Sequence, residues 1–148
     1  LFMAGCHVAH DCQIGNKVIL VNNAALAGHC ELEDEVIVGG LSGVHQFVRI
    51  GRGAMIGALT MVTADVIPYG LVQAPRGVLE GLNLVGLKRR SAGRSDIAAL
   101  RELLETLGSG TFRDSAREAA EKGSDNALVR EVLDFIRGPS ERSFLTPR

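Results

Sequence analysis

Aromatic residues are scarce in this chain of 148 residues, which contains no tryptophan, one tyrosine and five phenylalanines. Such scarcity is expected where the interior is a narrow stack of aliphatic side chains. Long hydrophobic runs are absent too: no stretch approaches the roughly 18 uninterrupted apolar residues of a membrane-spanning helix, and no signal peptide is visible. The net charge of −1 gives no reason to expect nucleic acid or an anionic membrane as a partner.

A six-residue repeat runs through the first part of the chain. Every sixth residue is large and apolar over eleven consecutive steps, namely Phe2, Val8, Ile14, Leu20, Leu26, Leu32, Val38, Val44, Ile50, Ile56 and Val62. A second column of small or β-branched residues precedes it by two positions and runs from Cys6 to Thr60, with Val66 after it. A hexapeptide period is typical of a parallel β-helix. If three hexapeptides form one coil, residues eighteen positions apart stack about 4.8 Å from one another.

Glycine and cysteine occupy particular places in this repeat. Gly15, Gly39, Gly51 and Gly57 each follow a member of the large column, where a corner needs backbone freedom or tight packing. The three cysteines all fall in the small column. Buried free thiols behave as small hydrophobic side chains, so we expect reduced core cysteines rather than a disulfide framework. Reduced cysteines favour a cytoplasmic setting.

Three segments are predicted along the chain. Residues 1–66 form the coils, and the repeat stops where Pro68 occupies the next large position. Residues 67–90 are rich in glycine and proline, which predicts an irregular crossing segment ending in a basic cluster. Residues 91–148 change to a helical period and predict a small α-helical domain, with helices over about 95–108, 112–123 and 124–138. Because the chain begins in register with the repeat, we expect further coils ahead of it in a longer protein.

All four histidines lie in the coils, outside both inward columns: His7, His10, His29 and His45. His10, Gly28 and Gln46 are eighteen positions apart, which places them one above another on one edge, and Asp11 follows His10. An outward imidazole with a carboxylate nearby is a candidate general base for a hydroxyl nucleophile. A glycine one coil away lets a backbone N–H approach a developing oxyanion.

The chain has no Gly-x-Ser-x-Gly motif and no outward cysteine to act as a nucleophile. This favours direct attack by a bound acceptor over a covalent enzyme intermediate. The first alternative is that the histidines are solvated corner residues. The second is a metal site, but the histidine spacings match no established zinc pattern.

Four motifs resemble the UDP-N-acetylglucosamine O-acyltransferase family of lipid A biosynthesis: HVAHDCQIGN (7–16), NNAALAGH (22–29), GGLSGVHQFVRIG (39–51) and GLNLVGLKRR (81–90). The resemblance extends over essentially the whole chain. It implies a left-handed parallel β-helix and a homotrimer with active sites in clefts between subunits. It also implies transfer of a 3-hydroxyacyl chain from acyl carrier protein to the 3-hydroxyl of the UDP-sugar, without a metal or organic cofactor.

The resemblance also implies roles for individual residues. His10 matches the general base, the N–H of Gly28 matches the oxyanion donor, and His29 matches a histidine that contacts the sugar nucleotide. Further substrate contacts are implied for His7, His45, Gln46, Asn83, Arg89 and Arg90, the last three in the nucleotide-binding segment. An arginine pair suits a diphosphate because the guanidinium fork matches its geometry. Val85 departs from the glutamate that some relatives carry.

Three other functions remain open from the sequence. A sister family acylates an amino group of a related sugar and shares the coils and the histidine base, although the GLNLVGLKRR segment argues against it. A carbonic anhydrase-like β-helix would need three histidines converging on zinc across a subunit interface. The third alternative is a chain that, without its further coils, folds as an inactive trimerising scaffold.

Overall fold

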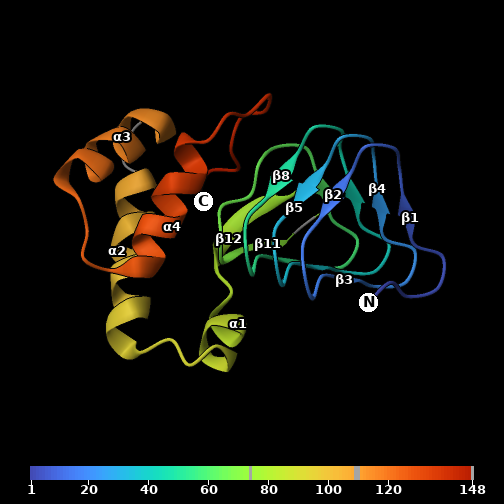
Figure 1. Cartoon of the computed structure of the whole chain (residues 1–148), viewed down its shortest axis with the longest axis horizontal. Helices are drawn as coiled ribbons and strands as arrows, with labels where there is room; N and C mark the ends of the chain where they lie inside the picture. The colour runs from blue at the N-terminus through green and yellow to red at the C-terminus, as the bar shows by residue number, and fades with distance from the viewer. Residues whose placement is uncertain (74, 109–110, 148) are drawn as a thin grey trace.

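The computed structural model describes residues 1–73, 75–108 and 111–147. A stack of coils built from short strands forms the first part, and a group of helices lies at one end of the stack (Figure 1). The N-terminus lies at the opposite end of the stack (Figure 1). The predicted fold class, a parallel β-solenoid followed by a helical region, is confirmed. The left-handed sense of the coils stays a prediction from the resemblance.

Three sheets form the faces of the stack. The β1 sheet contains β1 (His7–Val8), β4 (Ala25–Leu26), β7 (Gly43–Val44) and β10 (Met61–Val62). The β2 sheet contains β2 (Gln13–Ile14), β5 (Glu31–Leu32) and β8 (Arg49–Ile50). The β3 sheet contains β3 (Ile19–Leu20), β6 (Ile37–Val38), β9 (Met55–Ile56), β11 (Gly70–Gln73) and β12 (Val78–Leu82). Within the repeat, parallel partners are eighteen residues apart, which confirms the predicted coil length.

Both predicted columns point into the coils. From Val18 to Val62, every member of the two columns is at most 3% exposed. The small column also donates hydrogen bonds: the Sγ of Cys30 donates to the carbonyl of His45 at 3.2 Å, and the Oγ of Ser42 donates to that of Gly57 at 2.8 Å. Cys6, Cys12 and Cys30 are free thiols, as predicted. Small residues with a donor therefore fit this column because they satisfy a corner carbonyl from inside.

The glycines that follow the large column are required by close packing between coils. A Cβ on Gly39 would lie 2.5 Å from the backbone N of Ala58, and one on Gly51 would lie 2.4 Å from that of Pro68. Neither contact leaves room for a methyl group. Of the two reasons offered by the sequence, tight packing is therefore the one that applies to these two positions.

The corners of the coils place non-glycine residues in the left-handed region of backbone space. Asp11, His29 and Phe47 occupy successive levels of one corner with φ of 57°, 59° and 62°. Each corner is closed by a backbone hydrogen bond to the coil before it, as from the N–H of His29 to the carbonyl of His10 at 3.0 Å. Such conformations cost of order 1 kcal/mol for a residue with a Cβ, so the stacked coils must hold them.

The prediction of an irregular segment over 67–90 is wrong, because the stack continues there after a shortened coil. Val66 lies opposite Ile50 and Val72 opposite Ile56, sixteen residues apart instead of eighteen. Val66 therefore belongs with the large column, not with the small column as predicted. Because this coil is two residues shorter, the repeat moves out of register with the period of six. Pro68 then occupies the position where that period expects a large apolar residue. Strand β11 extends the β3 sheet and pairs in antiparallel fashion with β12.

Four helices follow: α1 (Leu84–Arg89), α2 (Arg94–Gly108), α3 (Phe112–Lys122) and α4 (Ala127–Arg137). The last three confirm the predicted helices, and α1 was missed because it has only six residues. The cap of α4 is Asn126, whose Oδ1 accepts from the N–H groups of Leu128 and Val129, so the predicted start at about residue 124 is slightly early. In the described ranges, the helices are all too short or too polar to cross a membrane.

A buried carboxylate joins the C-terminal segment, which comprises residues 138–147 after α4, to the coils. Asp65 is 0% exposed and accepts hydrogen bonds from the backbone N and the Nε of Arg49, both at 2.9 Å, and from the Oγ of Ser140 at 2.6 Å. The Arg49 guanidinium lies over the ring of Phe135, 4.5 Å from its centroid, and also faces Phe144. This ion pair fixes the chain after α4 against strand β8.

Candidate functional site

The predicted stack of polar residues lies along one edge of the coils, between the β1 and β2 sheets. We call it the histidine edge, which comprises His10, Asp11, Gly28, His29, Gln46 and Phe47. The regular corner hydrogen bonds hold its levels in register, since the N–H of Phe47 donates to the carbonyl of Gly28 at 3.1 Å. The eighteen-residue spacing in the sequence was therefore sufficient to bring these positions together.

His10 is paired with the adjacent carboxylate. Its Nδ1 lies 2.8 Å from the Oδ2 of Asp11, and the two side chains are 73% and 66% exposed. The hydrogen bond from His10 and the nearby His29 hold the pKa of Asp11 below its ordinary value. An ionised carboxylate only accepts hydrogen bonds, so Nδ1 of His10 carries the proton of the neutral ring. The lone pair on Nε2 is then available to take a proton from a substrate.

Gly28 lies directly against the imidazole of His10. A Cβ at Gly28 would be 2.8 Å from Cε1 and 2.9 Å from Nε2 of the ring. No described residue accepts a hydrogen bond from the N–H of Gly28. The basic nitrogen of His10 and a backbone donor without a described partner therefore lie side by side, which is the arrangement that general-base attack on a carbonyl requires.

His29 is held between two rings and the carboxylate. It stacks on Phe47 with a centroid distance of 4.8 Å and an interplanar angle of 5°, and it meets the ring of His10 edge-on at 5.0 Å. Its Nε2 lies 3.9 Å from the Oδ2 of Asp11. Phe47 was not singled out from the sequence, although its spacing of eighteen from His29 was a usable signal. His10, Asp11 and His29 form the one cluster within the described residues that could hold a metal ion.

The other two predicted histidines lie along the β1 sheet, because His7 belongs to β1 and His45 directly follows β7. His7 and His45 line the same shallow groove over Ala25 and Gly43. Arg142, from the C-terminal segment, reaches this groove: its Nη2 lies 2.6 Å from Nδ1 of His45, and its Nε donates to the carbonyl of Gln46 at 3.0 Å. Sequence reasoning missed Arg142 because it is nearly one hundred residues away in the chain.

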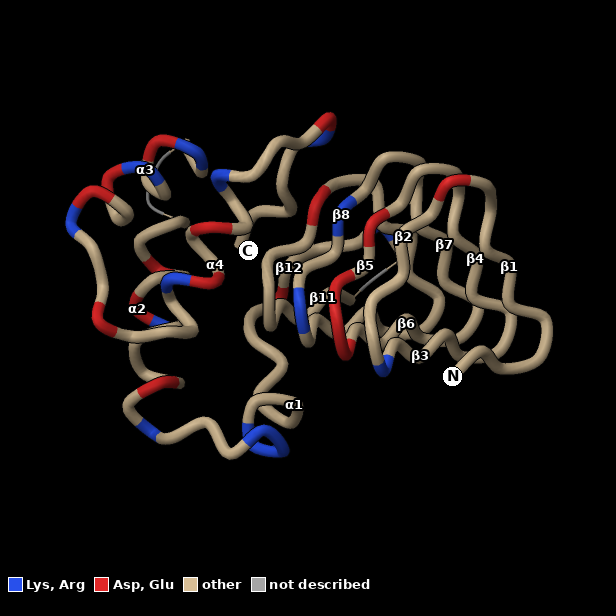
Figure 2. The backbone as a smooth tube through the Cα atoms, in the orientation of Figure 1, with Lys and Arg blue, Asp and Glu red and all other residues tan. Residues whose placement is uncertain are grey.

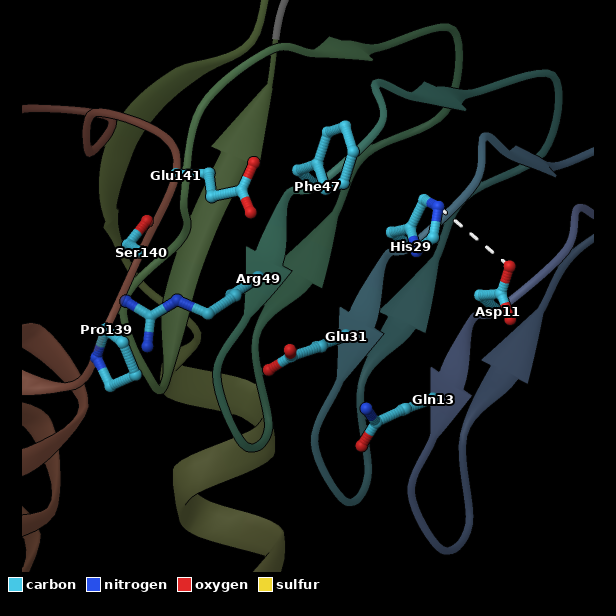
Figure 3. Close-up of a pocket in the computed structure, with 9 residues that line it drawn as sticks. All are labelled: Asp11, Gln13, His29, Glu31, Phe47, Arg49, Pro139, Ser140 and Glu141. Atoms are coloured by element: carbon cyan, nitrogen blue, oxygen red, sulfur yellow. Dashed lines mark ion pairs between the residues drawn. The ribbon is translucent and has the colours of Figure 1, made fainter.

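A cavity of about 280 Å³ lies beside the histidine edge, between the β2 sheet and the C-terminal segment (Figure 3). Its lining combines acidic, basic and aromatic side chains: Asp11, Gln13, His29, Glu31, Phe47, Arg49, Pro139, Ser140 and Glu141. Figure 3 shows Asp11 and His29 at one end and Ser140 and Glu141 at the other. The C-terminal segment therefore forms one wall of the cavity next to the candidate base.

The predicted nucleotide-binding residues lie on a different edge, between the β2 and β3 sheets. We call it the α1 edge, which comprises Lys17, Glu35, Gly53, Asn83, Arg89 and Arg90, all lining one pocket. Asn83 caps α1 through its Oδ1 and donates from Nδ2 to the carbonyl of Gly53 at 3.0 Å. Arg90 pairs with Glu35 at 3.0 Å. Arg89 is exposed and has no ion pair with a described residue, which leaves its guanidinium available to a ligand.

Within one chain, the structure thus separates the predicted residues into two groups. One corner carries His10, Gly28 and His29, and the next corner carries Asn83 and the arginines. The whole β2 sheet lies between these corners.

Comparison with known protein families shows which family the chain belongs to. Residues 65–145 match the family model described as UDP-N-acetylglucosamine O-acyltransferase, domain 2. The chain belongs to this family. The matched residues cover the β11–β12 hairpin, residues 83–90 of the α1 edge, the helices and most of the C-terminal segment, while the histidine edge lies before them.

Individual relatives extend the similarity over the coils. The acyl-[acyl-carrier-protein]–UDP-N-acetylglucosamine O-acyltransferase of Paracoccus denitrificans is 76% identical over 147 residues, which are 99% of this chain and 56% of that protein. The enzyme of the same name from Sinorhizobium fredii is 45% identical over 99% of this chain and 55% of its own length. The UDP-N-acetylglucosamine acyltransferase structure from Campylobacter jejuni has a TM-score of 0.88 and 38% identity, over 97% of this chain and 56% of that one. The chain therefore spans little more than half the length of these O-acyltransferases.

Proposed function

We propose that this chain carries the general base of an acyltransferase. In this proposal the whole protein moves a 3-hydroxyacyl chain from acyl carrier protein to the 3-hydroxyl of UDP-N-acetylglucosamine, the first step of lipid A biosynthesis, in the cytoplasm. The observation that carries the proposal is the close approach of the His10 ring to Gly28, where a Cβ would lie 2.9 Å from Nε2, with the Oδ2 of Asp11 2.8 Å from Nδ1. Membership of the O-acyltransferase family supplies the reaction class.

The chemistry follows from the tautomer of His10. Nε2 takes the proton from the sugar 3-hydroxyl as its oxygen attacks the carbonyl carbon of the acyl thioester. The N–H of Gly28 stabilises the oxyanion that forms, and such a donor contributes roughly 3–4 kcal/mol. When the intermediate collapses, the C–S bond breaks and the imidazolium returns the proton to the leaving thiolate. Asp11 stabilises the imidazolium in between, because its lowered pKa keeps it ionised.

The surface of the coils supports a homotrimer. Figure 2 shows no charged residue on β1, β4 and β7, and strands β3, β6 and β9 of the neighbouring sheet are also uncharged. The corner between these two sheets carries the exposed side chains of Leu41 (62%) and Leu59 (66%). An apolar corner flanked on both sides by these uncharged strands suits burial near a three-fold axis.

This packing would complete the site. In such a trimer the corner that carries Leu41 and Leu59 faces the three-fold axis. The β1 sheet of one subunit then meets the β3 sheet of the next subunit. The outer end of the β1 sheet is the histidine edge, and the outer end of the β3 sheet is the α1 edge. His10 of one subunit and Arg89 of its neighbour then border one cleft, where a guanidinium can bind the diphosphate of the UDP-sugar. The separation of the two groups within one chain is what this proposal explains.

The test is acyl transfer from 3-hydroxyacyl carrier protein to UDP-N-acetylglucosamine. The chain is assayed beside a version completed to the length of the Paracoccus denitrificans relative, each with and without His10→Ala. We expect the completed protein to be active and to lose a factor of about 10² to 10⁴ on substitution. Activity that is indifferent to His10→Ala would reject the mechanism. Activity only on a 3-amino sugar would reject the hydroxyl acceptor, and folding without transfer to any acceptor would indicate a scaffold.

A further inference from the structure

Three metal-binding side chains converge on the histidine edge. The Oδ2 of Asp11 lies 2.8 Å from Nδ1 of His10 and 3.9 Å from Nε2 of His29. One ligand atom from each residue lies within 4.8 Å of the other two. We propose that His10, Asp11 and His29 bind Zn²⁺, and that the ion acts as an inhibitor rather than as a cofactor.

The spacing of these atoms is close to what zinc requires. Zinc bonds to nitrogen and carboxylate oxygen are about 2.0–2.2 Å long, so the ligands of a tetrahedral site lie roughly 3.3 Å apart. The two measured separations, 2.8 and 3.9 Å, lie on either side of that distance. Small rotations of exposed side chains are therefore enough to bring the three atoms onto one ion.

The surroundings hold the three residues in place and leave them accessible. Asp11 and His29 occupy corner positions fixed by the coil, and His29 stacks on Phe47. The side chains of His10, Asp11 and His29 are 73%, 66% and 44% exposed, so an ion reaches them without opening the fold. Three protein ligands with an open fourth position form a common zinc arrangement, with water as the last ligand.

Zinc at this place removes the base. A neutral imidazole that binds a metal through Nδ1 carries its proton on Nε2. When zinc replaces the proton on Nδ1 of His10, that proton moves to Nε2, whose lone pair then no longer accepts the proton of the sugar hydroxyl. The binding part of this inference stands by itself, and the inhibitory part rests on the proposed function.

Zinc binding is measured first, on the chain itself, by calorimetric titration and by the visible absorption of Co²⁺ as a spectroscopic substitute. We expect one ion per chain, and at least a ten-fold loss of affinity in both Asp11→Asn and His29→Gln. His45→Gln is the matched control, because His45 lies outside the cluster and already faces the cationic Arg142. Binding that is absent, or equally strong in Asp11→Asn and His29→Gln, overturns the inference.

Inhibition is measured on the completed protein, with Zn²⁺ added and then removed by a chelator. We expect zinc to abolish acyl transfer at the concentration that fills the site, and the chelator to restore it. Transfer at full rate with the site filled overturns the inhibitory part. If the completed protein shows no transfer while zinc binds as expected, the proposed function fails and the zinc site stands.

A different observation assigns a role to the C-terminal segment. We infer that Arg142 is a positioning residue for His45. An arginine only donates hydrogen bonds, so the contact of 2.6 Å requires Nδ1 of His45 to accept and places the ring proton on Nε2. The second bond, from Nε to the carbonyl of Gln46, ties the same guanidinium to the backbone. His45 then presents an N–H donor to whatever occupies the groove.

The test compares Arg142→Ala with Arg142→Lys, because a lysine keeps the charge but lacks the planar fork that presents two separate nitrogens to the two acceptors. The tautomer of His45 is read from its ¹⁵N chemical shifts, and kcat/KM is measured on the completed protein. We expect Arg142→Ala to mix the tautomers and to lower kcat/KM about ten-fold, with a smaller effect for Arg142→Lys. Unchanged ¹⁵N shifts in Arg142→Ala overturn the assignment whatever the effect on rate, and the shifts decide it even if the enzyme proves inactive.

Discussion

The buried ion pair between Asp65 and Arg49 should be the most sensitive single point in the attachment of the helical region. Asp65 is fully buried and accepts three hydrogen bonds, while the side chain of Arg49 is 11% exposed. Asp65→Ala leaves the guanidinium between Phe135 and Phe144 without its counter-charge. Breaking a buried pair by removing one partner costs about 3–5 kcal/mol. For a chain of this size, that corresponds to a fall in Tm of roughly 10 °C.

The matched control is Asp134→Ala on α4, because it deletes the same atoms from an exposed pair. Asp134 lies 3.7 Å from Arg137, and the two side chains are 73% and 58% exposed. Such a pair contributes no more than about 0.5 kcal/mol. Both variants are unfolded thermally and with urea at one fixed chain concentration, since association shifts apparent stability.

A double variant and hydrogen exchange test the role of this ion pair further. Arg49→Met added to Asp65→Ala should recover part of the loss, because it removes the unpaired charge. Hydrogen exchange in Asp65→Ala should rise first at the N–H of Leu145, which donates to the backbone of residue 65 at 2.8 Å. If Asp65→Ala costs no more than Asp134→Ala, the buried pair does not hold the C-terminal segment and the reasoning fails.

Three other predictions follow from close contacts and burial. Gly51→Ala should destabilise the fold by roughly 1–3 kcal/mol, because its Cβ would meet Pro68 at 2.4 Å, whereas Gly93→Ala, with its nearest contact at 3.4 Å, should be close to neutral in the same unfolding assay. Gly28→Ala should keep the unfolding midpoint but lower acyl transfer by at least about 10²-fold, because the methyl group displaces the exposed ring of His10; an active variant would contradict the contact. Burial raises the pKa of Cys30 from 9.0 to about 11, so its contribution to stability is complete below pH 9 and is lost as the pH rises towards 11. At pH 8 a thiol reagent should modify Cys30 only after denaturation, and rapid labelling of the native chain would show that it is not buried.

The coils and the histidine edge were predictable because one chemical rule repeats along them. Each inward position takes an aliphatic or small residue, and a fixed spacing of eighteen sets which outward residues stack. The continuation of the β3 sheet after Val66 was not predictable in the same way, since two missing residues put Pro68 where the period expected an apolar side chain. Of the glycines and prolines that suggested an irregular segment, Gly70, Pro75, Gly77 and Gly81 belong to the β11–β12 hairpin, whereas Pro68 precedes it and Gly86 lies in α1.

The contributions of distant residues to the site escaped the sequence for a physical reason. Arg142 reaches His45 only because Asp65 and Ser140 anchor the segment before it, and no local pattern encodes that path. The separation of His10 from Arg89 onto two edges likewise depends on how the chain crosses the stack after β12. The motifs assign His10 and Arg89 to one site, whereas the structure places them on two separate edges of one chain.

The central claim, that a complete site takes its base from one subunit and its nucleotide-binding arginine from the next, is tested most directly by mixing inactive variants. Completed proteins carrying His10→Ala or Arg89→Ala are unfolded together in equal amounts, refolded, and assayed for acyl transfer. With random assembly, half of the base positions and half of the arginine positions are intact, so about one quarter of the sites combine both intact residues. We predict about a quarter of the unsubstituted activity from the mixture and almost none from either variant alone. A mixture as inactive as its components would show that both residues serve a site within one chain, which contradicts the account.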